Sequence, residues 1–384
     1  MQDPLWWRDG VIYQIYPRSF ADANGDGIGD LNGILQHLDH LNGAPHSLGV
    51  DAIWLSPFYP SPGFDFGYDV SDYQAVDPLF GTLEEFDRLV EEAHRRGIRI
   101  VLDLVLNHTS HLHPWFREAR SSRIDPRRDW YIWRDAGPDG GPPNNWQGVF
   151  GGSAWEWDET TGQYYYHMFL KEQPDLNWRN PEVRDAMWKV MRFWMDRGVD
   201  GFRLDVVNAY FKDDACRNNP PTLGVRAYDR QHHLYDLDRP EMATALREMR
   251  AVLDAYPDRM AVGEVLGNSP PLSARYCGDG RDQLHLAFNF HVLRQPWRPA
   301  AIQQALIAWE LSLHRQAWPC QVLSNHDVDR HTSRYGAGRQ SDARARVAAA
   351  LLLTLRGTPF LYYGEELGLQ NTPIPRREIV DPLG

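Results

Sequence analysis

Eight short apolar runs recur along this chain, and each of them ends in polar or charged residues. Helical signals fill most of the intervals between them. Strands that alternate with helices form a parallel sheet, and about eight such strands over this length predict a closed (β/α)8 barrel, which is an α/β fold. The predicted strands are residues 11–16, 52–56, 98–106, 199–205, 259–264, 283–289, 320–324 and 358–363.

Start and stop signals mark two of the predicted helices. Thr82 and Glu85 have the spacing of a capping box, and Gly97 is placed to end the helix that follows. Asn180 is the predicted N-cap of a second helix, which Gly198 ends. Each helix leads directly into an apolar run, as the repeating unit of a barrel requires.

A guanidinium and a carboxylate lie two residues apart in the sequence GFRLD at residues 201–205. Alternate residues of a strand project from the same face, so Arg203 and Asp205 are predicted neighbours. A nearby cation favours the ionised carboxylate, and the pattern therefore predicts a lowered pKa for Asp205. Polar residues at the C-terminal ends of the strands form the active site in such barrels. Glu264, His108 and Asp327 follow other predicted strands and are expected to join Asp205 there.

Charge and cysteine content limit the partners and the compartment. The net charge of −12 argues against nucleic acid or an anionic membrane as the main partner. The sequence has neither the apolar run of about eighteen residues that would predict a membrane span nor a signal peptide at its N-terminus. Cys216, Cys277 and Cys320 are odd in number and widely spaced, which predicts a cytoplasmic protein rather than a disulfide framework.

Oxygen-bearing residues alternate in a short segment after the first predicted strand. The predicted ligands are the side chains of Asp22, Asn24, Asp26 and Asp30 and the backbone carbonyl of Ile28. Such ligands suit a structural calcium ion, or magnesium. Residue 33 is a glycine where an EF-hand loop would have its closing glutamate, so the segment is not an EF-hand. A polar turn held by Asx hydrogen bonds is the alternative.

Roughly seventy residues rich in proline, glycine and tryptophan separate the third predicted strand from the next helix. A structureless loop of that length is improbable inside a compact domain. We therefore predict a small inserted domain at residues 108–178 that forms one wall of the active-site cleft. The barrel then comprises residues 1–107 and 179–384, with a shorter insertion at about 207–240.

Four ordered motifs resemble the signature regions of glycoside hydrolase family 13, the α-amylase family. They are DLVLNH at 103–108, GFRLD at 201–205, GEV at 263–265 and SNHD at 324–327. Further similar stretches at 11–20, 67–70 and 357–366 extend the resemblance over nearly the whole chain. The sequence QPDLN at 173–177 is similar to the signature of the oligo-1,6-glucosidase and α-glucosidase branch. Only the ordered set is specific, because each motif alone is weak.

The resemblance implies a retaining mechanism with Asp205 as the nucleophile and Glu264 as the acid/base. Glu264 has no cation beside it in sequence, so burial is expected to favour its protonated form. Asp327 resembles the third carboxylate, which would hold the 2- and 3-hydroxyls of the sugar.

The remaining predicted site residues also come from the resemblance. His108 and His326 resemble the histidines that hydrogen-bond the glucose unit, and Arg203 is grouped with them. Asp69 with Tyr68 resembles the residues that close the pocket at its non-reducing end. A closed pocket would accept only a terminal glucose, so the resemblance implies an exo-acting enzyme for small oligosaccharides.

The linkage is less constrained. In the resembling branch, valine after the nucleophile goes with α-1,6 links and threonine with α-1,4 links, and here the residue is Val206. Such a difference in pocket shape is worth only about 1–2 kcal/mol. Isomaltose-type substrates are therefore favoured, while maltose-type substrates, sucrose and transglucosylation stay open.

The sequence ends at Gly384, where the resemblance implies a further loop with an arginine, the last barrel helix and an all-β C-terminal domain. The expected barrel therefore has eight strands but only seven complete helical covers, and some apolar surface is expected to be exposed. The alternative function is a catalytically silent relative that serves as an interaction subunit. The intact set Asp205, Glu264 and Asp327 argues against it.

Overall fold

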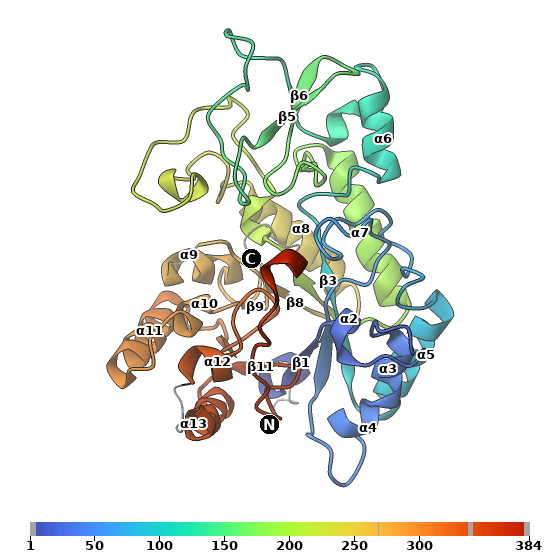
Figure 1. Cartoon of the computed structure of the whole chain (residues 1–384), viewed down its shortest axis with the longest axis vertical. Helices are drawn as coiled ribbons and strands as arrows, with labels where there is room; N and C mark the ends of the chain where they lie inside the picture. Colours follow the sequence, from blue (N-terminus) through green and yellow to red (C-terminus); the bar gives the residue numbers. More distant parts are fainter. Residues whose placement is uncertain (1–4, 268, 337–340, 380–384) are drawn as a thin grey trace.

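The computed structural model describes residues 5–267, 269–336 and 341–379. Eight parallel strands form its main sheet in the order β10-β11-β1-β2-β3-β7-β8-β9 (Figure 1). They are β1 (Ile12–Ile15), β2 (Ala52–Leu55), β3 (Arg99–Leu104), β7 (Gly201–Leu204), β8 (Met260–Gly263), β9 (Leu286–Ala287), β10 (Cys320–Val322) and β11 (Thr358–Tyr362). Each of the eight predicted runs contains one of these strands, so the prediction of a (β/α)8 barrel is confirmed.

The inward faces of the strands meet in one apolar cluster. Strand pairing aligns Trp54 with Val101, Val101 with Gly201, and Gly201 with Met260. A Cβ at Gly201 would lie 2.8 Å from the carbonyl oxygen of Met260, so only glycine fits there. The cluster draws on β1, β2, β3, β8, β9, β10 and β11 and includes Ile12, Ala52, Trp54, Val101, Met260, Val262, Leu286, Cys320, Val322 and Phe360. Strands from both ends of the strand order thus share one core, as in a barrel.

Helices cover the outside of the sheet (Figure 1). The larger ones are α5 (Leu83–Arg95), α7 (Pro181–Asp196), α8 (Met242–Asp254), α11 (Pro299–Ser312) and α13 (Ser341–Thr354). The predicted capping box at Thr82 and Glu85 is present at α5, and the Asn180 side chain caps α7 by accepting from the backbone N–H of Glu182. Apolar side chains remain exposed on the last two of these helices, with Leu311 on α11 81% and Val347 on α13 57% exposed.

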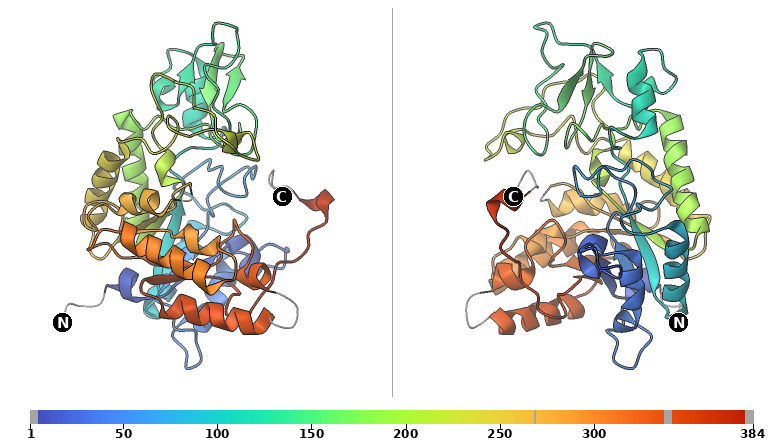
Figure 2. Two further views of the ribbon diagram at one scale, coloured as in Figure 1. Left: turned by 90° about the vertical axis from the view of Figure 1, so that its left-hand side faces the viewer. Right: turned by 45° about the vertical axis from the view of Figure 1, so that its right-hand side comes forward.

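An insertion between β3 and β7 stands above the barrel (Figure 2). It contains α6 (Pro114–Ser121) and an antiparallel sheet of β4 (Trp133–Arg134), β5 (Trp155–Asp158) and β6 (Gln163–Tyr166). Isolated bridges pair His108 with Asp175 and Tyr131 with Leu176. All these elements fall within the predicted range 108–178, and the first bridge joins its opening residue to its closing segment.

A buried ion cluster lies at the N-terminal ends of the strands, opposite the predicted active site. Asp200 lies just before β7, and its carboxylate is 2.7 Å from Nε2 of His94. The same carboxylate accepts hydrogen bonds from the backbone N–H of Ile100 and from Nη1 of Arg99, both at 2.9 Å. Burial acts to raise the pKa of Asp200, but the hydrogen bonds from His94 and Ile100 outweigh it and hold that pKa below its ordinary value.

Replacing Asp200 by asparagine should lower the free energy of unfolding by about 3 kcal/mol at pH 7, because one partner of a buried ion cluster is lost. A lowered pKa gives stability that is present above the unfolded-state value, about 3.9, and is lost as the pH falls through the folded-state value. The difference between wild type and variant in urea denaturation should therefore shrink below about pH 4. An unchanged difference at pH 3 would contradict the ionised state of Asp200.

Candidate active site

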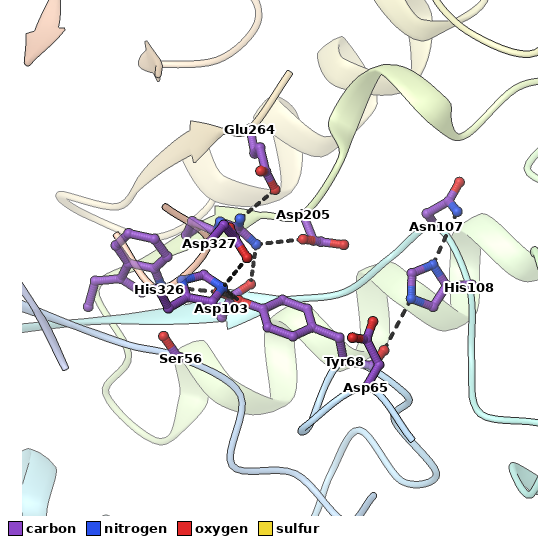
Figure 3. A network of polar contacts seen from close by, with 12 residues as sticks. Ser56, Asp65, Tyr68, Asp103, Asn107, His108, Asp205, Glu264, His326 and Asp327 are labelled. Atoms are coloured by element: carbon purple, nitrogen blue, oxygen red, sulfur yellow. Dashed lines mark hydrogen bonds and ion pairs between the residues drawn. The ribbon is translucent and has the colours of Figure 1, made fainter. Parts of the chain in front are cut away.

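Arg203 is the centre of the predicted site. It projects inward from β7 with only 1% of its side chain exposed. Its Nη1 donates to Asp103 Oδ1 at 2.9 Å and to Asp205 Oδ1 at 2.6 Å, and its Nη2 donates to Glu264 Oε2. One guanidinium thus joins three carboxylates from the ends of β3, β7 and β8 (Figure 3).

Strand register brings these groups together. Asp103 on β3 pairs with Arg203 on β7, which in turn pairs with Val262 on β8. Asp205 and Glu264 follow the last residues of their strands directly. The charged groups therefore meet at the C-terminal ends of the strands, as the sequence predicts.

Two electrostatic predictions about this cluster are wrong. Glu264 does have a cation beside it, because Arg203 reaches it from the neighbouring strand. The pKa of Asp205 is not lowered: burial raises it well above its usual range, and although Arg203 acts to lower it, the charges of Glu264 and Asp103 add to the effect of burial. The predictions failed because they considered only neighbours in sequence, whereas the interior removes water from all three carboxylates.

Glu264 acts directly on Asp205. Both the charge of Glu264 and a side-chain hydrogen bond with it raise the pKa of Asp205. Contact of this kind between buried carboxylates disfavours an ionised Asp205 beside a negative Glu264. One ionised and one protonated carboxyl group is the combination that a retaining glycosidase uses.

His326 lies beside this cluster, at the end of β10. Its Nε2 is 2.7 Å from the hydroxyl of Tyr68, which itself donates to Asp103 Oδ2 at 2.9 Å, and its Nδ1 is 2.9 Å from the side-chain amide of Gln14. Burial and the charge of Arg203 lower the pKa of His326 to about 4, so the ring is neutral at neutral pH. The imidazole ring of His326 stacks on the phenol ring of Tyr68, and the two ring centroids are 5.4 Å apart. Tyr68, Asp103 and His326 thus form one rigid polar group.

Asp327 occupies a different environment from the other carboxylates. Its Oδ1 lies 3.3 Å from Nε2 of His326, but 52% of its side chain is exposed. A carboxylate held at the edge of the site and open to solvent can accept hydrogen bonds from an incoming polyhydroxy ligand.

His108, at the end of β3, is fully enclosed between the barrel and the insertion. Its Nε2 lies 3.1 Å from the backbone carbonyl oxygen of Tyr68 and its Nδ1 lies 3.2 Å from Nδ2 of Asn107. Burial lowers the pKa of His108 to about 4, and it too is neutral at neutral pH. Both predicted histidines therefore offer a neutral ring to the site.

The predicted position of Asp69 at the end of the pocket is wrong. Its carboxylate is completely buried and accepts hydrogen bonds from Ser61 Oγ at 2.7 Å and from the backbone N–H groups of Phe64 and Asp65. Asp69 therefore holds the preceding loop together. Asp65, four residues earlier in the same motif, lies beside His108 and accepts from Nε2 of Gln173 at 2.7 Å (Figure 3).

The residue after Asp205 has an unusual backbone. Val206 has a φ of 36°, in the left-handed region that a β-branched side chain rarely adopts. Such strain persists where the surroundings over-determine the conformation, and it concentrates at functional sites. Sequence patterns give no signal for it, because nothing local in GFRLD requires a positive φ.

The predicted metal loop is stabilised by its own backbone. Asp22 accepts from the N–H groups of Gly25 and Gly27 at 2.6 and 2.8 Å, which lowers its pKa, and Asp26 accepts from Ile28 N–H at 2.8 Å. Asn24 and Asp30 accept further backbone N–H groups. Across the residues described, no three His, Cys, Asp or Glu side chains are arranged as a set of metal ligands. The loop offers oxygen donors of the type calcium needs, and calcium binding there stays a prediction.

Comparison with known proteins gives a consistent family assignment. The family model for the α-amylase catalytic domain matches residues 14–383. The chain is 51% identical to a probable α-glucosidase of Rhizobium meliloti strain 1021, covering 100% of this chain and 71% of that one. It is 45% identical to an oligo-1,6-glucosidase of Heyndrickxia coagulans, covering 98% and 69% respectively.

A crystal structure agrees with these sequence relatives. The α-glucosyl transfer enzyme XgtA superposes with a TM-score of 0.94 at 47% identity, over 99% of this chain and 72% of that chain. The matched part of each relative thus includes the barrel, the insertion and the carboxylate cluster around Arg203. This chain belongs to the α-amylase family, as a glycoside hydrolase of the α-glucosidase and oligo-1,6-glucosidase type.

Proposed function

We propose that the chain is a retaining, exo-acting α-glucosidase that releases terminal non-reducing glucose from short α-linked oligosaccharides. The observation that carries the proposal is the buried pair Asp205 and Glu264, joined by Arg203 at the C-terminal ends of β7 and β8. Asp205, Glu264 and Asp327 are the proposed catalytic groups, and Asp65, Tyr68, His108, Arg203 and His326 the proposed substrate-binding and supporting groups.

The proposed reaction has two steps. In the first, Asp205 attacks the anomeric carbon while Glu264 donates its proton to the glycosidic oxygen, so that a glucosyl ester forms and the leaving alcohol departs. In the second, Glu264 takes a proton from water, and the resulting oxygen nucleophile attacks the ester from the other side, which restores the α-configuration. Asp327 accepts hydrogen bonds from sugar hydroxyls, with the neutral rings of His108 and His326 beside it as further polar groups of the site.

Exo action is the part of the proposal that depends on the carboxylate beside His108. Asp65 rather than Asp69 is the carboxylate that faces His108, and the insertion holds it through Gln173. A half-buried acceptor there would bind the terminal hydroxyls of a single glucose unit. Glucose should therefore be released one unit at a time.

The preferred linkage is the finer part of the proposal. Relatives of this chain are named oligo-1,6-glucosidases, α-glucosidases and trehalose-6-phosphate hydrolases. The structural relative XgtA is named for α-glucosyl transfer. Val206 leads us to favour α-1,6 links, with α-1,4 links, sucrose and transfer to other hydroxyls as competing activities.

Anomer-resolved proton NMR tests the proposed reaction. The chain incubated with isomaltose, and separately with maltose, should first release α-glucose from the non-reducing unit, and the faster disaccharide identifies the preferred linkage. Initial release of β-glucose would contradict retention. Release of maltose from soluble starch before any glucose would contradict exo action, and complete inactivity of the folded chain would favour a silent interaction subunit.

Calcium should stabilise the chain through the loop of Asp22, Asn24, Asp26, Ile28 and Asp30. A ligand at a hundred times its dissociation constant contributes about 2.7 kcal/mol, which corresponds to a rise in Tm of about 5 °C or more. Differential scanning fluorimetry after EDTA treatment, with calcium or magnesium added back, measures this shift and ranks the two ions. The variant Asp22→Ala should lose the response, and an equal response in that variant would contradict this site.

Two further predictions belong to the same proposal. The structure has no disulfide among its cysteines, and within the described residues no helix has the length and hydropathy to cross a bilayer. We propose a small oligosaccharide as the partner and the cytoplasm as the location.

A further inference from the structure

Lys212 is a buried cation in the loop that follows the proposed nucleophile. Only 2% of its side chain is exposed, and its Nζ donates to Asp175 Oδ2 and, at 2.9 Å, to Asn107 Oδ1. Asp175 ends the insertion, while Asn107 ends the segment after β3. One ammonium therefore joins three segments that are distant in sequence, and the proposed mechanism gives it no task.

The ammonium determines which way the Asn107 amide points. An ammonium has donors and no acceptor, so the amide oxygen must face Lys212. The amide nitrogen then donates to Asp175 Oδ2 at 2.8 Å and lies 3.2 Å from His108 Nδ1. The reversed amide would set two donors against each other at Lys212 and an oxygen against the carboxylate of Asp175.

The Asn107 amide in turn determines which nitrogen of His108 carries its proton. An amide N–H can only donate, so Nδ1 must hold a lone pair and the proton must sit on Nε2. Nε2 lies 3.1 Å from the carbonyl oxygen of Tyr68, which can only accept. The side-chain nitrogen of Gln173 also lies 3.1 Å from Nε2 and donates one N–H to Asp65. Its other N–H could donate to Nε2 only in the Nδ1–H form of the ring. Two of the three contacts therefore favour Nε2–H.

We propose that Lys212 is a positioning residue that fixes the Asn107 amide and thereby holds His108 in its Nε2–H form, with that N–H directed at the carbonyl oxygen of Tyr68. Donation from this ring to a sugar hydroxyl would rest on the proposed function. The tautomer of the His108 ring is independent of that function. Three charged groups act directly on His108: Asp175, Lys212 and Asp69. Asp65 lies farther away, on the other side of Gln173.

Nitrogen NMR of the ring tests the proposal without reference to activity. The full chain is labelled with 15N-histidine, and His108→Gln identifies the His108 signals in a long-range proton–nitrogen spectrum at pH 7. Wild type should show the neutral Nε2–H pattern. Lys212→Met removes the charge at similar volume and should give the Nδ1–H pattern or a mixture. The Nδ1–H pattern in wild type, or unchanged Nε2–H in Lys212→Met, would overturn the proposal.

A second variant covers the chance that Lys212→Met does not fold, because it leaves Asp175 buried without its cation. Asn107→Asp keeps an acceptor for Lys212 but has no N–H for His108, so the ring should move to Nδ1–H or become protonated. Retention of the neutral Nε2–H pattern in this variant would also contradict the proposed chain of contacts.

Kinetics separates positioning from general loss of stability. Each variant should raise KM for the disaccharide about ten-fold, the effect of one hydrogen bond, with a smaller change in kcat. Asp200→Asn, which breaks a buried ion cluster at the other end of the barrel, is the matched control and should change neither KM nor the His108 spectrum. An equal rise in KM in that control would assign the effect to stability alone. If wild type hydrolyses neither disaccharide, the proposed function fails while the spectra still decide the role of Lys212.

Discussion

Replacement of Asp205 by asparagine should lower kcat/KM for isomaltose or maltose by about 10⁴-fold or more, which corresponds to a loss of ~5.5 kcal/mol of transition-state stabilisation. The amide cannot form the glucosyl ester, and it removes the negative charge that stabilises the developing oxocarbenium ion. The proposed substrate contacts of His108, His326 and Asp327 do not involve the altered group, so KM should change far less than kcat. Initial rates of glucose release measure both constants.

Asp185→Asn is a suitable control for Asp205→Asn. Asp185 is an exposed carboxylate on α7, so the same chemical change there should leave kcat and KM at their wild-type values. An Asp205→Asn variant that retains more than about a tenth of the activity would remove Asp205 as nucleophile.

Replacement of Arg203 by glutamine should have the largest effect on stability. Arg203 is the shared partner of Asp103, Asp205 and Glu264, and it is buried. Loss of the cation from such a cluster costs about 3–5 kcal/mol, because the carboxylates stay buried without it. We expect a fall in Tm of about 6 °C or more. Arg203 acts to lower the pKa of Asp205, so without it the acid limb of the activity profile should move to higher pH.

Two further variants define the role of the Arg203 side chain. Arg203→Lys keeps the charge but lacks the planar fork, so it can bridge fewer carboxylates and should recover only part of the stability. Arg192→Gln changes an exposed arginine on α7 and should have little effect. An unchanged Tm in Arg203→Gln would mean that the carboxylates are not held in their charged form in the native state.

The barrel could be predicted from sequence because its signals are local. Apolar runs, the capping box at Thr82 and the Asn180 cap each depend on a few adjacent residues, and the structure contains them. The positions of Asp205 and Glu264 at strand ends followed from the same local signals. Long-range contacts were the source of the failures. The cation beside Glu264 comes from a residue 61 positions away.

The choice between Asp65 and Asp69 failed for a different, local reason. Asp69 and Asp65 belong to one short motif, and either could have faced the site. Only the hydrogen bonds from Ser61 and Phe64 show that Asp69 is turned into its own loop. Lys212 was missed because its partners Asn107 and Asp175 are 105 and 37 residues away. A lysine in the shorter insertion after β7 carries no sequence signal of burial.

The position of Arg203 between Asp205 and Glu264 has a consequence for the whole catalytic cycle. In the proposed mechanism, the reaction starts with Asp205 ionised and Glu264 protonated, while Arg203 stays positive and Asp103 keeps one charge state throughout. In the ester intermediate, Asp205 is neutral and Glu264 is negative, so the sum over the four groups is the same. The negative charge therefore moves from one side of a single guanidinium to the other. In this mechanism the surrounding dipoles face a constant total charge and need not rearrange between the two steps, which keeps the cost of reorganisation low.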